Sequence, residues 1–343
     1  MEHLEYYKAT SECKRNAEKS INTCFHPGCQ NKSINSHILQ KNGILSSIAP
    51  DKHLWQIEES DFDEGLFKFQ QRGLNAIFCF NGFCNEHDTK LFQKIEGGTI
   101  DFDDYESCLL FTLRTLYNEI YRKEVNILHY QCLMERIPKF KDSERCKAHM
   151  EGDRKGIEDM RSTEKEIWDD LTNKTESFVF SHRELNRVEL CISSFYTYDT
   201  SFEMEKFKDH EKPSDIFINL FPYKGKSVLL MGYHKPDEKK VKGYFNAFFK
   251  ESERRILRPI TNLILFQCET WVCSDNFHKV KVKGFEPLFY DAIKFSTRNY
   301  NERKVFDINI FESDFHSRFR AWANEFVQQK HFINTKIRSC SIN

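Results

Sequence analysis

The spacing of hydrophobic residues divides the chain into regions of different character. Between residues 102 and 172 apolar side chains recur every three or four positions, which is the spacing along one face of an α-helix. Leu109, Leu113 and Leu116 belong to the first such run. The pattern predicts helices over 102–133 and 150–172 that pack against a common core.

From about residue 176 the spacing changes to two, which is typical of β-strands. The strand-like runs include SFVFSH, VELCISSFYTY, DIFINLFPY, KSVLLMGYH, LILFQCETWVCS and HKVKVKG. Tyr223-Lys224-Gly225-Lys226 has the composition of a hairpin turn. A helical pattern over about 239–257 interrupts the strands. We therefore expect residues 176–310 to be strand-dominated, as a mainly antiparallel sheet with flanking helices.

Length and local composition predict an α+β protein of three units. The chain has 343 residues, which is enough for two or three domains. Residues 21–96 are rich in Cys, His, Asn and Gly, and we expect residues 1–98 to form an N-terminal module. Residues 99–175 would be a helical connector, and residues 176–343 an α+β domain that binds a target, a signal or a partner.

The charge balance limits how the chain could bind nucleic acid. It carries 51 Lys+Arg and 52 Asp+Glu, a formal net charge of −1. Such a chain does not bind polyanions by bulk charge, so a nucleic-acid site must be a local patch. The run HKVKVKG places Lys279, Lys281 and Lys283 on one face of a predicted strand. These lysines would either follow phosphates or protect an edge strand from pairing.

The start of the chain and its cysteines bear on its location. MEHLEYYKATSECKR contains no apolar signal-peptide core, and no apolar run approaches ~18–20 residues. We expect a cytoplasmic protein that does not associate with membranes. In a reducing compartment, the 12 cysteines are better explained as metal ligands and buried thiols.

Two short-spaced pairs of ligand-type residues lie in the first unit. Cys24 and Cys29 flank a Pro-Gly turn, and Cys84 is followed three residues later by His87. Structural zinc takes four tetrahedral sulfur and nitrogen ligands, usually from two such pairs. The spacing predicts one Zn²⁺ held by these four side chains, with His26 as an alternative to one cysteine of the first pair.

The segment 21–96 resembles the HNH, or ββα-metal, nuclease family in its zinc-stapled form. In that family a cysteine pair precedes a strand bearing the general-base histidine, and a second pair leads into a helix whose first residue binds the catalytic metal. His37, within the alternating run SINSHIL, matches the base position. Asp88 matches the helix-borne ligand, although the family usually has histidine there and cysteine at the position of His87.

The resemblance also implies an asparagine that orients the base. Asn81 matches it best, and Asn75 and Asn42 remain alternatives. A carboxylate ligand at position 88 favours a hard catalytic ion, Mg²⁺ or Mn²⁺.

The function that the resemblance implies is metal-dependent hydrolysis of phosphodiester bonds in nucleic acid, with DNA favoured. Nucleases of this kind joined to another domain often act in bacterial defence against phage, so the C-terminal domain would bind a protein partner or an activating signal. The alternative hypothesis is a non-catalytic zinc module that binds nucleic acid or a protein.

Overall fold

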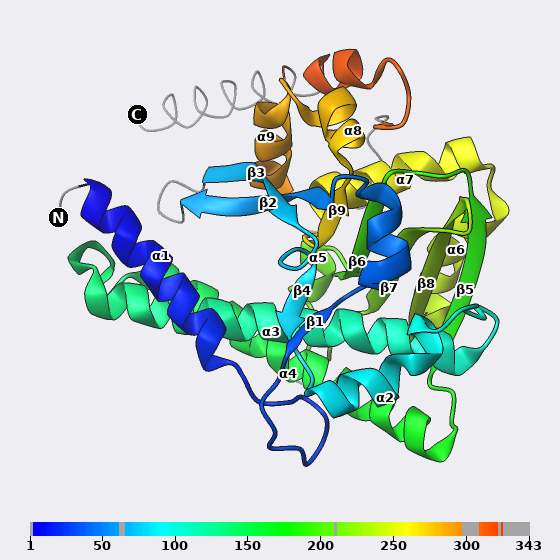
Figure 1. Cartoon of the computed structure of the whole chain (residues 1–343), viewed down its shortest axis with the longest axis horizontal. Coiled ribbons are helices and arrows are strands. Elements are labelled where there is room, and N and C mark those ends of the chain that lie inside the picture. Colours follow the sequence, from blue (N-terminus) through cyan, green and yellow to red (C-terminus); the bar gives the residue numbers. More distant parts are fainter. Residues whose placement is uncertain (1–2, 62–65, 209–210, 297–308, 322–323, 325–343) are drawn as a thin grey trace.

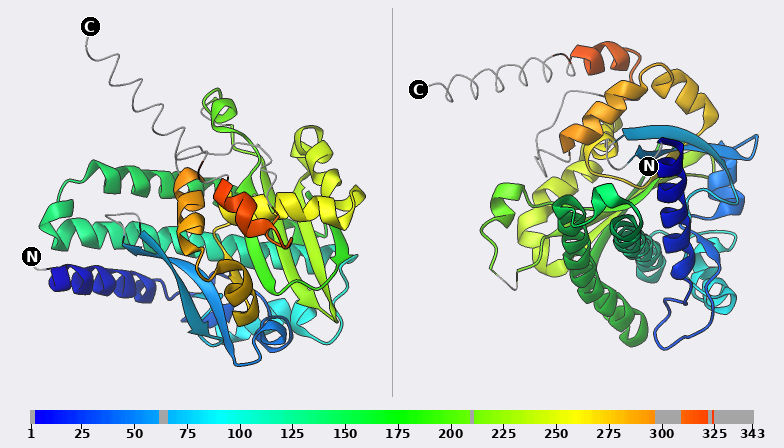
Figure 2. Two further views of the ribbon diagram at one scale, coloured as in Figure 1. Left: turned by 90° about the horizontal axis from the view of Figure 1, so that it is seen from above. Right: turned by 90° about the vertical axis from the view of Figure 1, so that its left-hand side faces the viewer.

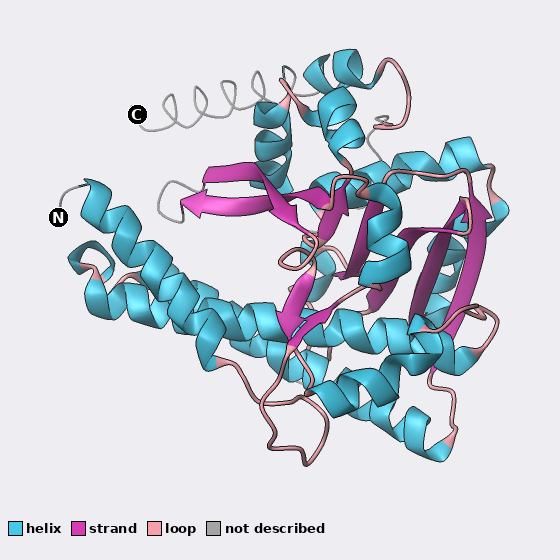
Figure 3. Ribbon diagram, in the orientation of Figure 1, coloured by secondary structure: helices cyan, strands magenta, loops and turns pink. Residues whose placement is uncertain are grey.

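The computed structural model describes residues 3–61, 66–208, 211–296, 309–321 and 324. It contains a seven-stranded sheet with helices on both faces and a separate two-stranded pair (Figures 1 and 3). The predicted α+β class, with a mainly antiparallel sheet and flanking helices, is confirmed. None of the described helices is long and apolar enough to cross a membrane.

The large sheet has the strand order β3-β2-β9-β6-β7-β8-β5, and each pair of neighbours is antiparallel. Its strands are β2 (His53–Asp61), β3 (Leu66–Gly73), β5 (Phe178–Leu185), β6 (Leu190–Thr197), β7 (Asp215–Tyr223), β8 (Lys226–His234) and β9 (Trp271–Cys273). The predicted hairpin joins β7 to β8, and Lys224 and Gly225 in its turn have φ of 46° and 82°. Two successive positive φ values are typical of the type I′ turn that suits the twist of a hairpin.

Both faces of the central strands are buried, which explains why their sequences are almost continuously apolar. One face packs on α3 (Tyr105–Arg136), beside which α4 (Glu144–Asn173) lies. The opposite face packs on α6 (Glu238–Lys250), α7 (Glu253–Phe266) and α9 (Glu286–Ser296). Figure 2 shows these layers from two further directions. The helices expected over 102–133 and 150–172 are thus present as α3 and α4.

Two runs that the sequence predicts as strands are helical. The residues LILF (263–266) form the last turn of α7. Ile264 continues the buried helical stripe that begins with Ile256 and Ile260. HKVKV forms a π-helical turn, η5 (His278–Val282), directly after the short helix α8 (Asp275–Phe277). The Ser274 hydroxyl caps α8 by accepting from the Phe277 N–H, and this local start outweighs the alternating pattern.

The expectation of strand dominance therefore holds as far as β8 and fails after it. From His234 onward the described residues of the 176–310 segment are mainly helical, with β9 as their one strand. A four-residue helix, α5 (Ser201–Met204), also lies between β6 and β7.

The sheet takes strands from both sides of the predicted boundary at residue 98. β2 and β3 come from the predicted N-terminal module, yet β2 pairs with β9. Trp55 and Ile57 of β2 pack against the same core as the C-terminal helices, and this burial holds the hairpin in the large sheet. The division into three units stays a prediction.

A disulfide joins Cys13 of α1 (His3–Ser20) to Cys132 of α3. The expectation that the cysteines serve only as metal ligands and buried thiols is wrong for this pair. The two helices pack along one another and bring the residues together across 119 positions of sequence, a contact that cysteine spacing does not reveal.

Candidate metal centre and the histidine beside it

A small ββα unit forms the N-terminal site. Strand β1 (Asn35–His37) pairs antiparallel with β4 (Cys79–Asn81), so that His37 lies opposite Cys79. Three residues after β4, the chain enters α2 (Asn85–Glu96), with Cys84 as the residue before the first turn.

Local backbone hydrogen bonds shape the loop that carries the first cysteine pair. The Cys29 N–H donates to the His26 carbonyl at 3.0 Å, and the Cys24 N–H donates to the Asn31 carbonyl at 2.9 Å. Gly28 has φ +76°, a conformation that favours glycine. The loop therefore turns back and brings both cysteines to the start of α2.

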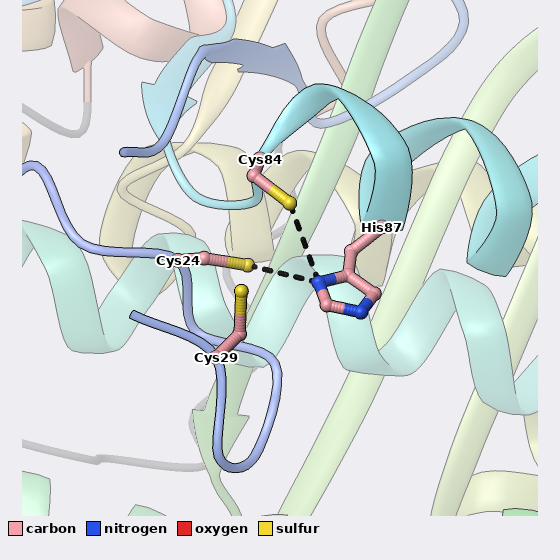
Figure 4. A group of neighbouring side chains, drawn as sticks. All are labelled: Cys24, Cys29, Cys84 and His87. Carbon is pink, nitrogen blue, oxygen red and sulfur yellow. Dashed lines mark hydrogen bonds between the residues drawn. The ribbon is translucent and has the colours of Figure 1, made fainter. Parts of the chain in front are cut away.

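The four predicted ligands converge (Figure 4). Their ligand atoms all lie within 4.8 Å of one another. His87 Nδ1 is 3.5 Å from Cys24 Sγ and 3.3 Å from Cys84 Sγ. A tetrahedral zinc site with ordinary bond lengths has nitrogen–sulfur edges of about 3.5 Å and sulfur–sulfur edges of about 3.8 Å. The cluster therefore fits a metal ion such as zinc in size and in donor type.

The surroundings of the thiols differ. The His87 backbone N–H hydrogen-bonds to the Cys84 sulfur at the start of α2 and lowers the pKa of this thiol. Burial raises the pKa of Cys24 to about 11. A bound cation would supply the positive charge that keeps both sulfurs as thiolates.

His26 is not part of the ligand cluster. Its ring stacks on that of His87, with centroids 3.7 Å apart and planes at 6°. Trp168 of α4 packs edge-on against the His26 ring, with centroids 5.0 Å apart. The alternative in which His26 replaces a cysteine is wrong for this structure, and His26 instead supports His87.

The metal loop rests on the helical layer. Phe25 stacks on Tyr117 of α3, and the Tyr117 hydroxyl lies 3.1 Å from the Phe25 carbonyl oxygen. Trp168 Nε1 donates to the same hydroxyl at 2.8 Å. Sequence reasoning missed these contacts, because Tyr117 and Trp168 stand within ordinary apolar helical stripes.

His37 is half-buried, and one of its ring nitrogens is held. Nε2 lies 2.7 Å from the Leu74 carbonyl oxygen, to which it donates. This bond puts the proton on Nε2 and makes Nδ1 the basic nitrogen of the neutral ring. Nδ1 has no hydrogen-bond partner among the described residues. Burial, the largest influence, lowers the pKa of His37, so the ring is neutral at pH 7.

Asp88 lies near His37, on the first turn of α2, and its charge acts on the pKa of that histidine. The guanidinium of Arg114 forms an ion pair with this carboxylate. Arg114 of α3 is 1% exposed, and its Nη2 lies 3.5 Å from Asp88 and 2.6 Å from Glu96. The same guanidinium lies over the ring of Phe92, 3.9 Å from the centroid. Arg114 is another site residue that sequence reasoning missed, since it stands within the buried stretch 107–120 of α3.

Asn81 makes no hydrogen bond to the His37 ring in the described structure. Its amide donates to the carbonyls of Glu18, at 3.1 Å, and Ile21, at 3.3 Å, and so ties the end of α1 to β4. The register explains this, because Asn81 lies opposite Asn35 rather than opposite His37. The orienting group in this structure is the Leu74 carbonyl.

The two alternative asparagines occupy different places. Asn75 directly follows the residue that holds His37; its carbonyl accepts from Asn35 Nδ2 at 3.0 Å and its side-chain oxygen accepts from Lys41 Nζ at 3.2 Å. Asn42 lies in the irregular turn η1 (Lys41–Leu45), with non-helical φ and ψ. Of the two, Asn75 thus belongs to the loop that positions the histidine.

Compared with known proteins, the chain matches no family model, no curated protein and no solved structure.

Proposed function

We propose that this protein is a metal-dependent endonuclease that hydrolyses phosphodiester bonds in nucleic acid, with DNA as the favoured substrate, and that the N-terminal cluster holds zinc. One observation carries the proposal. A ββα unit beside a four-ligand metal cluster brings a neutral histidine with a free Nδ1 into the neighbourhood of a helix-borne carboxylate.

The residues would have the following roles. Nδ1 of His37 accepts a proton from the attacking water, while the Leu74 carbonyl fixes the ring. Asp88 holds a hard divalent ion, Mg²⁺ or Mn²⁺, which supplies charge neutralisation at the scissile phosphate when bound. Arg114 fixes the Asp88 carboxylate from the protein side. Zinc, at the cysteine and histidine cluster, keeps the loop and α2 together.

The biological setting rests on family analogy. We infer a cytoplasmic effector in bacterial defence against phage, whose C-terminal region receives a protein partner or an activating signal.

A second candidate is a zinc module that binds nucleic acid or a protein without cutting. It is favoured by the residue at one position, where many HNH nucleases have an acidic residue or histidine as a second metal ligand. Ser36 stands there, is 2% exposed, and has an Oγ without a hydrogen-bond partner among the described residues. A neutral hydroxyl brings no negative charge to a divalent cation, so the charge that holds the catalytic ion would come from Asp88.

Cleavage of plasmid DNA and of RNA in Mg²⁺ or Mn²⁺ tests the proposal. His37→Ala should lower the rate by ~10²–10⁴, the usual worth of a general base, with metal content and circular dichroism unchanged. The matched control is His182→Ala, which removes another half-buried strand histidine and should cut like the parent.

Asp88→Ala should also lose activity, and higher Mg²⁺ or Mn²⁺ concentrations should partly restore it. If His37→Ala cuts as fast as the parent, the assigned base is wrong. If the parent cuts neither DNA nor RNA in any metal, with or without a cell extract from infected bacteria, the non-catalytic candidate replaces the nuclease.

A further inference from the structure

A cavity of about 560 Å³ lies at one end of the large sheet. The β2–β3 hairpin forms one side, and α8, η5 and α9 form the other; Figure 1 shows these elements grouped together. Aromatic side chains contribute much of its lining: Trp55, Phe69, Tyr290 and the imidazole of His278. Small-molecule sites usually have volumes of ~300–1,000 Å³. The cavity therefore has the size and the walls for a ligand with a flat ring.

Two aromatic rings of the lining form a parallel stack. The rings of Trp55 and His278 are stacked with centroids 3.7 Å apart and planes at 3°. Trp55 Nε1 donates to Asp275 Oδ1 at 3.1 Å, which fixes the indole in its plane. Phe69 lies 5.6 Å from His278, centroid to centroid, and 6.2 Å from Tyr290. The stack and the hydrogen bond to Asp275 hold the indole and the imidazole in place at the cavity.

His278 supplies an unsatisfied polar atom at this wall. The residue is 5% exposed, and its Nε2 is buried without a hydrogen-bond partner among the described residues. Buried polar atoms in folded proteins are nearly always paired, so an unpaired one beside a cavity indicates a place for a ligand group. Burial lowers the pKa of His278, and the ring is therefore neutral at pH 7.

Charged and hydroxyl groups converge on the same wall. Lys279 forms an ion pair with Asp275. Lys283 and Glu286 also line the cavity, form no ion pair with another described residue, and both act on the pKa of His278. The Tyr290 hydroxyl accepts from the Phe69 N–H at 3.2 Å and keeps its own hydrogen to donate. Among the described residues, the lining thus offers one ammonium and one carboxylate without an ion pair, and one hydroxyl donor.

We propose that this cavity binds a nucleotide unit, with the base against the Trp55–His278 wall and the phosphate at Lys283. Glu286 would accept hydrogen bonds from sugar hydroxyls or from an amino group of the base. Stacking on aromatic side chains tolerates every base, because each has a π-face, and a lysine ammonium is a common phosphate ligand. A free nucleotide and an unpaired nucleotide of a strand present the same chemistry. The site is separate from His37, and its occupancy does not depend on cleavage.

Binding to the full-length protein tests the proposal, in buffer without added Mg²⁺ or Mn²⁺ so that no strand is cut. The probes are adenosine monophosphate, a six-nucleotide adenylate strand and inorganic phosphate, measured by equilibrium dialysis and tryptophan fluorescence. We expect the nucleotide or the strand to bind, and phosphate alone to bind at least about tenfold more weakly.

Matched variants locate the site. Trp55→Leu and Lys283→Ala should each weaken binding about tenfold or more, and His278→Phe should weaken it while keeping a stacked ring. Lys281→Ala is the control, because this lysine lies on the same helical turn but donates to the Glu312 carbonyl at 2.8 Å and does not line the cavity. It should bind like the parent.

The binding results either uphold the nucleotide site or overturn it. Binding of the mononucleotide supports a free ligand, and binding of the strand alone supports an unpaired nucleotide of nucleic acid; both uphold the site. Failure of both probes to bind overturns the proposal, as does binding that Lys283→Ala leaves unchanged. Lys283 is exposed and forms no ion pair within the described part of the chain, so its variant should fold even if Trp55→Leu does not.

Discussion

The bridge between Cys13 and Cys132 leads to a quantitative expectation. It joins α1 to α3 across 119 residues of sequence. Cross-linking a loop of this length restricts the unfolded chain by an entropy worth about 4.9 kcal/mol at 25 °C in the simplest chain model. Native disulfides typically contribute ~2–4 kcal/mol, so we expect reduction to lower the free energy of unfolding by that amount.

The difference in the free energy of unfolding is measured by urea unfolding, followed by circular dichroism, with and without a reductant. The reductant is a phosphine, because a dithiol would compete with the cysteines for bound metal. The double variant Cys13→Ser/Cys132→Ser should match the reduced parent and should not respond to the reductant. Cys146→Ala is the matched control, because Cys146 is a buried free thiol in the same hydrophobic cluster. This variant should lose the same amount of stability with and without reductant. The difference in the free energy of unfolding between its oxidised and reduced forms should therefore equal that of the parent.

Two results would refute the reasoning. If thiol labelling of protein purified under oxidising conditions modifies Cys13 and Cys132, the bridge does not form. If the bridge forms but the parent unfolds at the same urea concentration in both conditions, loop closure contributes nothing. α1 would then be held by its other contacts, such as the Arg136–Glu12 ion pair at 3.0 Å.

Three further predictions concern the metal loop, the anchoring of α1, and the effect of acid on the stability of the protein. Cys24→Ser should lose bound metal and unfold at lower temperature than the parent, since structural zinc contributes folding energy; elemental analysis that finds the parent free of zinc would contradict this. Asn81→Ala removes two hydrogen bonds to the end of α1 and should destabilise the protein by ~1–2 kcal/mol in urea unfolding. The rate of cleavage per folded molecule should stay at the parent level, whereas in His37→Ala it should fall. Burial lowers the pKa of His129 on α3 to about 4, so below pH ~6.5 the unfolded chain takes up this proton before the folded protein does, and stability falls until about pH 4. This residue should contribute ~3 kcal/mol to the loss, and the same pH series measured on His129→Phe should show a loss smaller by about that amount.

The parts of the candidate site that the sequence predicts are those encoded by short spacing. Cys24 and Cys29 share one turn, and Cys84 and His87 share the first turn of one helix, so each pair is fixed by a few residues of local backbone. The two pairs then need a single long-range contact, which the β1–β4 pairing provides.

The parts that the sequence does not predict depend on tertiary contacts or on the backbone. The group that holds His37 is a main-chain carbonyl, at Leu74, and a carbonyl carries no side-chain signature. Arg114 acquires its role from Asp88 and Glu96, which lie on another helix. The short run 278–283 is compatible with a strand and with a helical turn, and the Ser274 cap decides between them.

The role of the helical segment is also larger than that of a connector. Residues 107–120 of α3 are all buried, because both layers of the molecule pack on this helix. Arg114 and Tyr117 face the N-terminal site. Thr115, the residue after Arg114, faces the sheet, and its Oγ1 is 2.8 Å from Ser193 Oγ on β6. Further along, the Thr270 hydroxyl donates to the Glu119 carboxylate at 2.8 Å, next to β9. A helix buried on every side cannot keep its structure when either layer is removed, since its apolar faces would be exposed to water. The metal centre and the sheet therefore share one core, and we expect loss of the sheet to disturb the His37 site.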